Sequence, residues 1–160
     1  MAATDLGRLE AIHLADRVGA PVRAVESVAA RAGVGLAGDR YGDLAEPQVS
    51  SGGNARGDVT LIEAEQIEWL AAETGIRLAP GETRRNLTTR GIRLNDLVGR
   101  TFRIGSVTAE GLRLCEPCAY LQGQIGKPIL EPLVHRAGLR ARLLDDGELH
   151  VGDPIEVEPA

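Results

Sequence analysis

Short apolar stretches separated by glycine and proline dominate the chain. Residues 8–15 alternate loosely between apolar and polar side chains, which is typical of a β-strand with one buried face. The stretch 22–32 is rich in apolar residues and fits either a strand or a helix. Glycine-bounded stretches of β type recur along the rest of the chain. The pattern predicts strands over 8–15, 58–62, 85–89, 101–104, 107–114, 139–144 and 155–158.

Three segments have the features of helices. In 63–74, apolar residues recur at helical spacing, and Gly75 is suited to end the helix. Residues 119–125 and 129–137 predict two shorter helices. They are separated at Pro128, because proline begins helices well and continues them badly.

The segments between these elements indicate the fold class. Residues 33–38 and 45–57 are polar or glycine-rich and predict loops, and a loop as long as the second is often functional. Turns are predicted at 145–147 and 152–154. Many short strands, glycine turns and a few inserted helices predict a mostly β fold, either a β-barrel or a strongly bent sheet. At 160 residues, we expect one domain over 1–160.

The composition excludes some classes of protein. Hydrophobic residues make up 43% of the chain and charged residues 26%, as in globular proteins. A net charge of −5 argues against general nucleic-acid binding, which needs a basic surface. No apolar run approaches the roughly 20 residues that span a bilayer, and the first residues lack a signal-peptide pattern. We therefore expect no membrane association and a cytoplasmic location, where cysteines stay reduced.

Arginine supplies 17 of the 18 basic residues, and Lys127 is the one lysine. Recognition of a phosphate group must therefore come from arginine, backbone amides or hydroxyl groups. A lysine Schiff base could form only at Lys127 or the N-terminus, which is thin support for pyridoxal phosphate.

Both cysteines lie in the stretch Cys115-Glu-Pro-Cys118. Four interpretations are open: a redox disulfide, half of a zinc site, two inert buried thiols, or one reactive or metal-ligating cysteine. Zinc prefers four ligands, and the three histidines of the chain are scattered singly. A thioredoxin-like dithiol would need a βαβ context. The local pattern favours a single working cysteine.

A second polar cluster covers residues 84–90. On a strand, Arg84, Asn86 and Thr88 would share one face, which offers guanidinium, amide and hydroxyl groups to a phosphate or a polar heterocycle. A solvated edge strand would show the same pattern. The turn 38–42, which carries Arg40, is equally unspecific when it is taken alone.

Taken together, these segments resemble the MOSC domain, the module named after the C-terminal part of molybdenum-cofactor sulfurases. Any one motif is weak, but the motifs occur in the expected order over nearly the whole chain. They are Gly-Val-Gly-Leu-Ala-Gly-Asp-Arg-Tyr (33–41), Val-Thr-Leu-Ile-Glu-Ala-Glu (59–65), Gly-Glu-Thr-Arg-Arg-Asn-Leu-Thr-Thr-Arg-Gly (81–91), Leu-Asn-Asp-Leu-Val-Gly-Arg-Thr-Phe-Arg-Ile-Gly (94–105), Leu-Cys-Glu-Pro-Cys (114–118) and Val-Gly-Asp-Pro-Ile (151–155).

The resemblance implies a β-barrel-like fold and a bound molybdenum cofactor, which is a pterin dithiolene (molybdopterin) carrying a phosphate. Cys118 matches the family's essential cysteine, which ligates molybdenum or carries sulfur. Arg84 and Asn86 match the family's Arg-x-Asn element, which holds the cofactor, and Arg40 matches a further contact to the phosphate. Thr88 lies on the same predicted face and joins the candidate cofactor-binding residues.

The resemblance leaves three functions open. The first is a molybdenum oxidoreductase that reduces small N-hydroxylated substrates, with electrons from a separate donor protein, because the chain has no iron–sulfur cysteine set and no nucleotide-binding glycine fingerprint. The second is a sulfur carrier or cofactor-handling protein, in which a cysteine desulfurase loads Cys118 with a persulfide. The third is a binding module for a small anion. The sulfurases' own desulfurase domain does not occur here, so pyridoxal phosphate is not expected.

Overall fold

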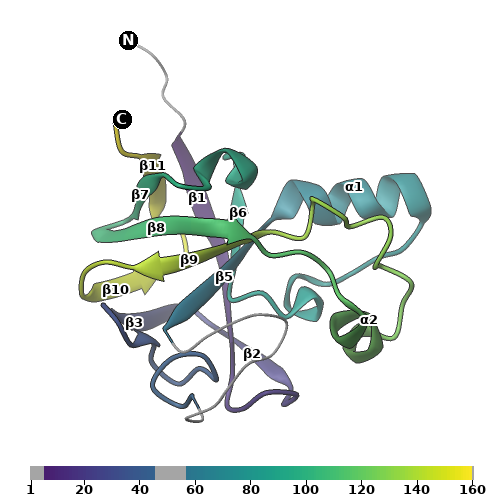
Figure 1. Ribbon diagram of the computed structural model, residues 1–160, viewed down its shortest axis with the longest axis horizontal. Helices are drawn as coiled ribbons and strands as arrows, with labels where there is room; N and C mark the ends of the chain where they lie inside the picture. Colours follow the sequence, from purple (N-terminus) through teal and green to yellow (C-terminus); the bar gives the residue numbers. More distant parts are fainter. Residues whose placement is uncertain (1–5, 46–56, 160) are drawn as a thin grey trace.

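The computed structural model describes residues 6–45 and 57–159, which form a β-barrel with helices on one side (Figure 1). The strands and α-helices follow one another with two short 3₁₀ helices, η1 and η2, between them. In chain order they are β1 (Leu6–Ala15), β2 (Val22–Val25), β3 (Ser27–Arg31), β4 (Gly35–Leu36), β5 (Asp58–Glu63), α1 (Ala64–Thr74), η1 (Pro80–Thr83), β6 (Leu87–Arg90), η2 (Leu94–Leu97), β7 (Thr101–Ile104), β8 (Val107–Leu114), α2 (Ala119–Ile125), β9 (Leu139–Leu143), β10 (Gly147–His150) and β11 (Pro154–Val157).

The main sheet closes on itself. Its strands are hydrogen-bonded in the order β11-β7-β8-β9-β5-β6-β1, and β11 pairs again with β1, so seven strands of the described chain form a closed barrel. All pairs in the ring are antiparallel except β5 with β6. β2 extends the sheet beside β1, and β10, β3 and β4 form a smaller sheet. The prediction of a mostly β, barrel-like fold with a few helices is confirmed.

Two apolar clusters hold the fold together. The first fills the barrel and includes Leu9, Leu61 and Phe102, all with no exposed surface. The second lies where α1 and α2 meet the segment between α2 and β9, on the side of the barrel where Figure 1 shows both helices. Its buried members are Leu70, Leu78, Leu121, Ile129, Leu133 and Ala137.

The predicted helix over 129–137 is wrong. The segment forms successive turns, and Leu133 and Ala137 still pack into the second cluster. Pro132 has no N–H to donate to a helical ladder. His135 takes a left-handed conformation with φ 62°, which ends any helical path at that point.

Other predictions needed smaller corrections. The ambiguous stretch 22–32 forms the two strands β2 and β3. The predicted loop 33–38 contains the short strand β4, and the predicted turn 145–147 ends in the first residue of β10, a strand that was not predicted. The predicted loop 45–57 lies, apart from its first and last residues, outside the described residues.

We expect replacement of Gly138 by alanine to unfold the protein or destabilise it severely. Gly138 has φ +119°, and an added Cβ would lie 1.9 Å from the carbonyl oxygen of Leu61 in the adjoining strand. Left-handed backbone strain and the displacement of the Leu61 backbone together should lower the free energy of unfolding by about 3 kcal/mol or more. Chemical denaturation followed by circular dichroism measures the loss.

Gly123→Ala is the matched control. Gly123 lies in α2, and a Cβ there would meet no atom within 4 Å. We expect the free energy of unfolding of this variant to rise by about 0.5–1 kcal/mol, because alanine is the better helix former. Equal denaturation midpoints for the two variants would contradict the expectation.

Candidate functional site

The turn 38–42 places a buried arginine at one end of the candidate site. Asp39 accepts hydrogen bonds from the backbone N–H groups of Ala15 and Tyr41, each at 3.1 Å, which fixes the turn against β1. The same carboxylate accepts a bond from Nη1 of Arg40 at 3.1 Å. Nη2 of Arg40 donates to the backbone carbonyl of Arg84 at 2.8 Å. The structure therefore brings Arg40 and Arg84 together, although they lie far apart in the sequence.

Arg84 has unusual backbone and side-chain surroundings. It follows η1 in the left-handed conformation, with φ 61°. Its Nη2 atom is buried and has no hydrogen-bond partner within the described residues. Burial lowers the pKa of the Arg84 guanidinium, and the positive charge of Arg40 lowers it further. Two neighbouring guanidinium groups, one with an unused buried donor, form a site that would be stabilised by an anion.

Arg84 lines a hollow of about 330 Å³ between the start of β2, η1 and α2. Gly81 forms part of its wall, and a Cβ there would lie 2.8 Å from Cδ2 of His13. Lys127 bonds Glu82 at 2.9 Å and lowers the pKa of that carboxyl group. The lining residues are Pro21, Val22, Gly81, Glu82, Arg84, Gln124 and Ile125.

The structure corrects the predicted common face of Arg84, Asn86 and Thr88. β6 begins only at Leu87, and the left-handed backbone of Arg84 breaks the alternation that the prediction assumed. The Asn86 amide is fully buried: its oxygen accepts from the backbone N–H of Thr60 at 3.1 Å. Its nitrogen donates to the His13 carbonyl at 3.1 Å, so Asn86 links three strand regions. Thr88 is also fully buried, and its hydroxyl has no partner within the described residues.

The two cysteines have different surroundings, and neither forms a disulfide. Cys118 directly precedes the predicted helix and is the N-cap of α2: its sulfur accepts a hydrogen bond from the backbone N–H of Leu121 at 3.4 Å. It is half-buried and packs against the second cluster. Cys115 is only 2% exposed, and its side chain hydrogen-bonds to Arg140. Accessibility therefore favours Cys118 as the working thiol.

Sequence reasoning missed the part that Arg85 plays. Its side chain is buried, with Nε donating to the carbonyl of Ala137 and Nη2 to that of Cys115, both at 2.8 Å. Arg85 thus connects the chain just before β6 to residues 115–118, which we call the cysteine segment, and to the turns before β9. Its place in an arginine-rich motif was visible, but the distant carbonyl groups that receive its hydrogen bonds were not.

No group of three or more His, Cys, Asp or Glu side chains gathers into a metal site in residues 6–45 and 57–159. Within the same ranges, no helix has both the length and the apolar character needed to cross a membrane.

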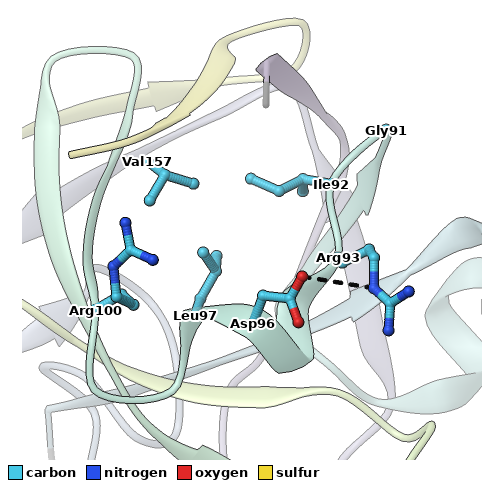
Figure 2. Close-up of a pocket in the computed structure, with 7 residues that line it drawn as sticks. All are labelled: Gly91, Ile92, Arg93, Asp96, Leu97, Arg100 and Val157. Atoms are coloured by element: carbon cyan, nitrogen blue, oxygen red, sulfur yellow. Dashed lines mark ion pairs between the residues drawn. The ribbon is translucent and has the colours of Figure 1, made fainter. Parts of the chain in front are cut away.

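A second hollow, of about 320 Å³, lies between η2, the start of β7 and the end of β11. Figure 2 shows Ile92, Leu97 and Val157 around it, with the Arg93–Asp96 ion pair at one side. That ion pair measures 3.6 Å and is well exposed. None of the site residues predicted from the sequence lines this hollow.

Several solved structures of known proteins have a similar fold. The YuaD protein from Bacillus subtilis has a similar solved structure, with 16% identity, 95% of each chain covered and a TM-score of 0.80. The YiiM protein from Geobacillus stearothermophilus is 13% identical, with 96% of this chain and 75% of that chain covered and a TM-score of 0.71. YiiM from Escherichia coli is 17% identical, with 96% and 70% covered and a TM-score of 0.66. At these identities the likeness concerns the fold.

No curated protein sequence matches the chain significantly. The family model of the MOSC domain matches residues 47–156, more than half of the chain. The chain therefore belongs to the MOSC domain family, which is associated with the molybdenum cofactor.

Proposed function

We propose that the chain binds the molybdenum cofactor and reduces small N-hydroxylated substrates, with Cys118 as the protein ligand of molybdenum. The observation that carries the proposal is the buried Nη2 donor of Arg84, which has no hydrogen-bond partner among residues 6–45 and 57–159 and lies near the positive charge of Arg40. A phosphate group supplies the charge and the acceptor oxygens that this arrangement lacks.

In this proposal, the two arginines and Cys118 have different roles. Arg84 would bind the cofactor phosphate directly, while Arg40 would add positive charge and hold the Arg84 backbone through its carbonyl. Cys118 would present its sulfur from the start of α2, oriented by the Leu121 N–H. When bound, the cofactor would supply a metal that gives two electrons to the substrate as its oxygen is removed and that an external donor re-reduces, and a thiolate suits its soft donor set.

Asn86 and Thr88 contribute differently to this proposal. Asn86 would act indirectly, because its amide is engaged with Thr60 and His13 and so fixes the strand that follows Arg84. Thr88 would bind cofactor only if the covering residues moved, since it has no exposed surface here.

Sulfur transfer is the second candidate, and the half-buried N-cap position of Cys118 favours it. A cysteine desulfurase carrying a persulfide would be the partner. The Cys118 thiolate would attack the outer sulfur of that persulfide, a new S–S bond would form, and the desulfurase thiolate would leave.

Electron supply distinguishes the two candidates. We expect protein purified from a cofactor-competent host to contain molybdenum and to show no turnover of N-hydroxylated compounds with NADH or NADPH alone. Turnover should begin with a reduced partner protein or a chemical donor, because the chain lacks the usual signatures of a nucleotide or iron–sulfur site.

The test combines metal analysis, absorption spectroscopy and substrate reduction. Turnover by pure protein with NADH would contradict the expectation. Inactivity with a strong chemical donor, in protein shown to hold molybdenum, would favour the sulfur carrier. In that case, incubation with a desulfurase should leave a persulfide on Cys118, detectable as a mass increase of one sulfur atom.

A further inference from the structure

Glu116, which lies between the two cysteines, is held at both carboxylate oxygens by one residue. Its Oε1 accepts from the backbone N–H of His135 at 2.7 Å, and its Oε2 lies 2.6 Å from Nδ1 of the same histidine. These contacts connect the segment before α2 to the turns before β9, which run beside it (Figure 1). We call this pair the Glu116–His135 clasp.

The histidine of the clasp has a left-handed backbone conformation, which residues other than glycine rarely adopt. His135 has φ 62°, and Arg84 is the only other non-glycine residue with positive φ in the described ranges. Such a backbone persists when its surroundings determine it. Here the Glu116 carboxylate contacts both the backbone N–H and the imidazole ring of His135. The side-chain amide of Asn95 donates to the carbonyl of His135 at 2.9 Å.

Within the described residues, the other hydrogen bonds of the cysteine segment lie at its two ends. At Cys115, the backbone N–H donates to the Gly138 carbonyl at 2.8 Å, and Arg85 bonds the carbonyl of Cys115. At Cys118, the sulfur caps α2. Between them, Pro117 is buried but has no N–H to donate, so the Glu116 side chain provides the hydrogen-bonded anchor in the middle.

We propose that Glu116 is a positioning residue, which through His135 fixes the direction from which Cys118 presents its sulfur. The inference rests on the proposed function only in taking Cys118 as the working thiol. Loss of the clasp would leave the backbone at Glu116 free to open locally, while the buried residues Cys115 and Pro117 on either side keep their packing.

Alkylation by iodoacetamide, located by mass spectrometry, tests the proposal on the complete protein without its cofactor. In Glu116→Ala we expect Cys118 to react at least about threefold faster, because its half-buried sulfur becomes more accessible. Buried Cys115 should remain unreactive, and so reports whether the fold is intact. Glu116→Gln should recover much of the original rate, because its side-chain oxygen can still accept from the His135 N–H.

Two further variants complete the test. His135→Asn removes the contact between the imidazole ring and Glu116, and asparagine tolerates the left-handed conformation. This variant should also increase the alkylation rate of Cys118. Glu148→Ala is the matched control: it removes a 2.7 Å contact to His150, another exposed Glu–His pair, on β10. The alkylation rates of both cysteines should be the same in this variant as in the original protein.

An unchanged Cys118 rate in Glu116→Ala and His135→Asn would overturn the proposal. So would parallel acceleration of Cys115 and Cys118, or no recovery in Glu116→Gln, since either result would indicate general loosening of the fold. If Glu116→Ala does not fold, the rates of His135→Asn and Glu116→Gln decide. Because the readout needs no molybdenum, failure of the proposed activity would leave its result standing.

Discussion

Replacement of Cys118 by serine is expected to abolish retention of molybdenum, with a fall of at least about tenfold in metal content relative to the original protein. A hydroxyl group is a poor ligand for a metal that favours sulfur donors. The variant should still fold, because serine is itself a preferred N-cap residue and can accept from the Leu121 N–H. Metal analysis of protein from a cofactor-competent host measures the effect.

Cys115→Ser is the control for this experiment. Cys115 is buried and bonded to Arg140, and a serine of similar shape can keep that hydrogen bond. Its molybdenum content should stay within about twofold of the original. Full metal retention by Cys118→Ser, or equal loss in both variants, would remove Cys118 from the role proposed for it.

Replacement of Arg84 by methionine should release the cofactor without weakening the fold. Loss of charge-assisted bonds to a phosphate is worth about 1.5–3 kcal/mol, or roughly tenfold to a hundredfold in cofactor affinity. Burial and the positive charge of Arg40 both disfavour the charged Arg84 in the ligand-free protein. The free energy of unfolding should therefore stay the same or rise, as expected for a residue kept for binding.

Arg93→Met provides the comparison. The Arg93 side chain is 81% exposed and lies at the other hollow, in Figure 2. We expect its cofactor content and unfolding midpoint to match the original protein. Cofactor analysis and thermal denaturation of both variants decide the matter. A strongly destabilised Arg84→Met, or one that keeps its cofactor, would contradict the binding role of the buried Nη2 donor.

The elements that the sequence predicted well depend on local patterns. Strands over 101–104 and 107–114 and the helix over 119–125 have the predicted bounds. In each, alternation or a helical repeat is bounded by glycine or proline, so that neighbouring residues alone determine the element. α1 also ends as predicted, at Gly75 in the left-handed conformation.

The failures depend on partners that are distant in the chain. Residues 129–137 have helical composition, but Pro132 and the clasp on His135 impose turns. The surroundings of Asn86 arise from Thr60 and His13, on other strands. Resemblance identified Arg40 and Arg84 as candidates, yet only the fold shows that one bonds the backbone of the other.

The closed ring of strands also constrains how the protein is made. Leu6 in the first strand pairs with Glu156 in the last, 150 positions later. During synthesis, the start of β1 therefore lacks this neighbour until β11 has left the ribosome. Contacts of such long sequence separation form slowly, and an unpaired strand edge can recruit other chains. The nascent protein should thus be most prone to aggregation shortly before its final strand emerges, when chaperones would protect it most.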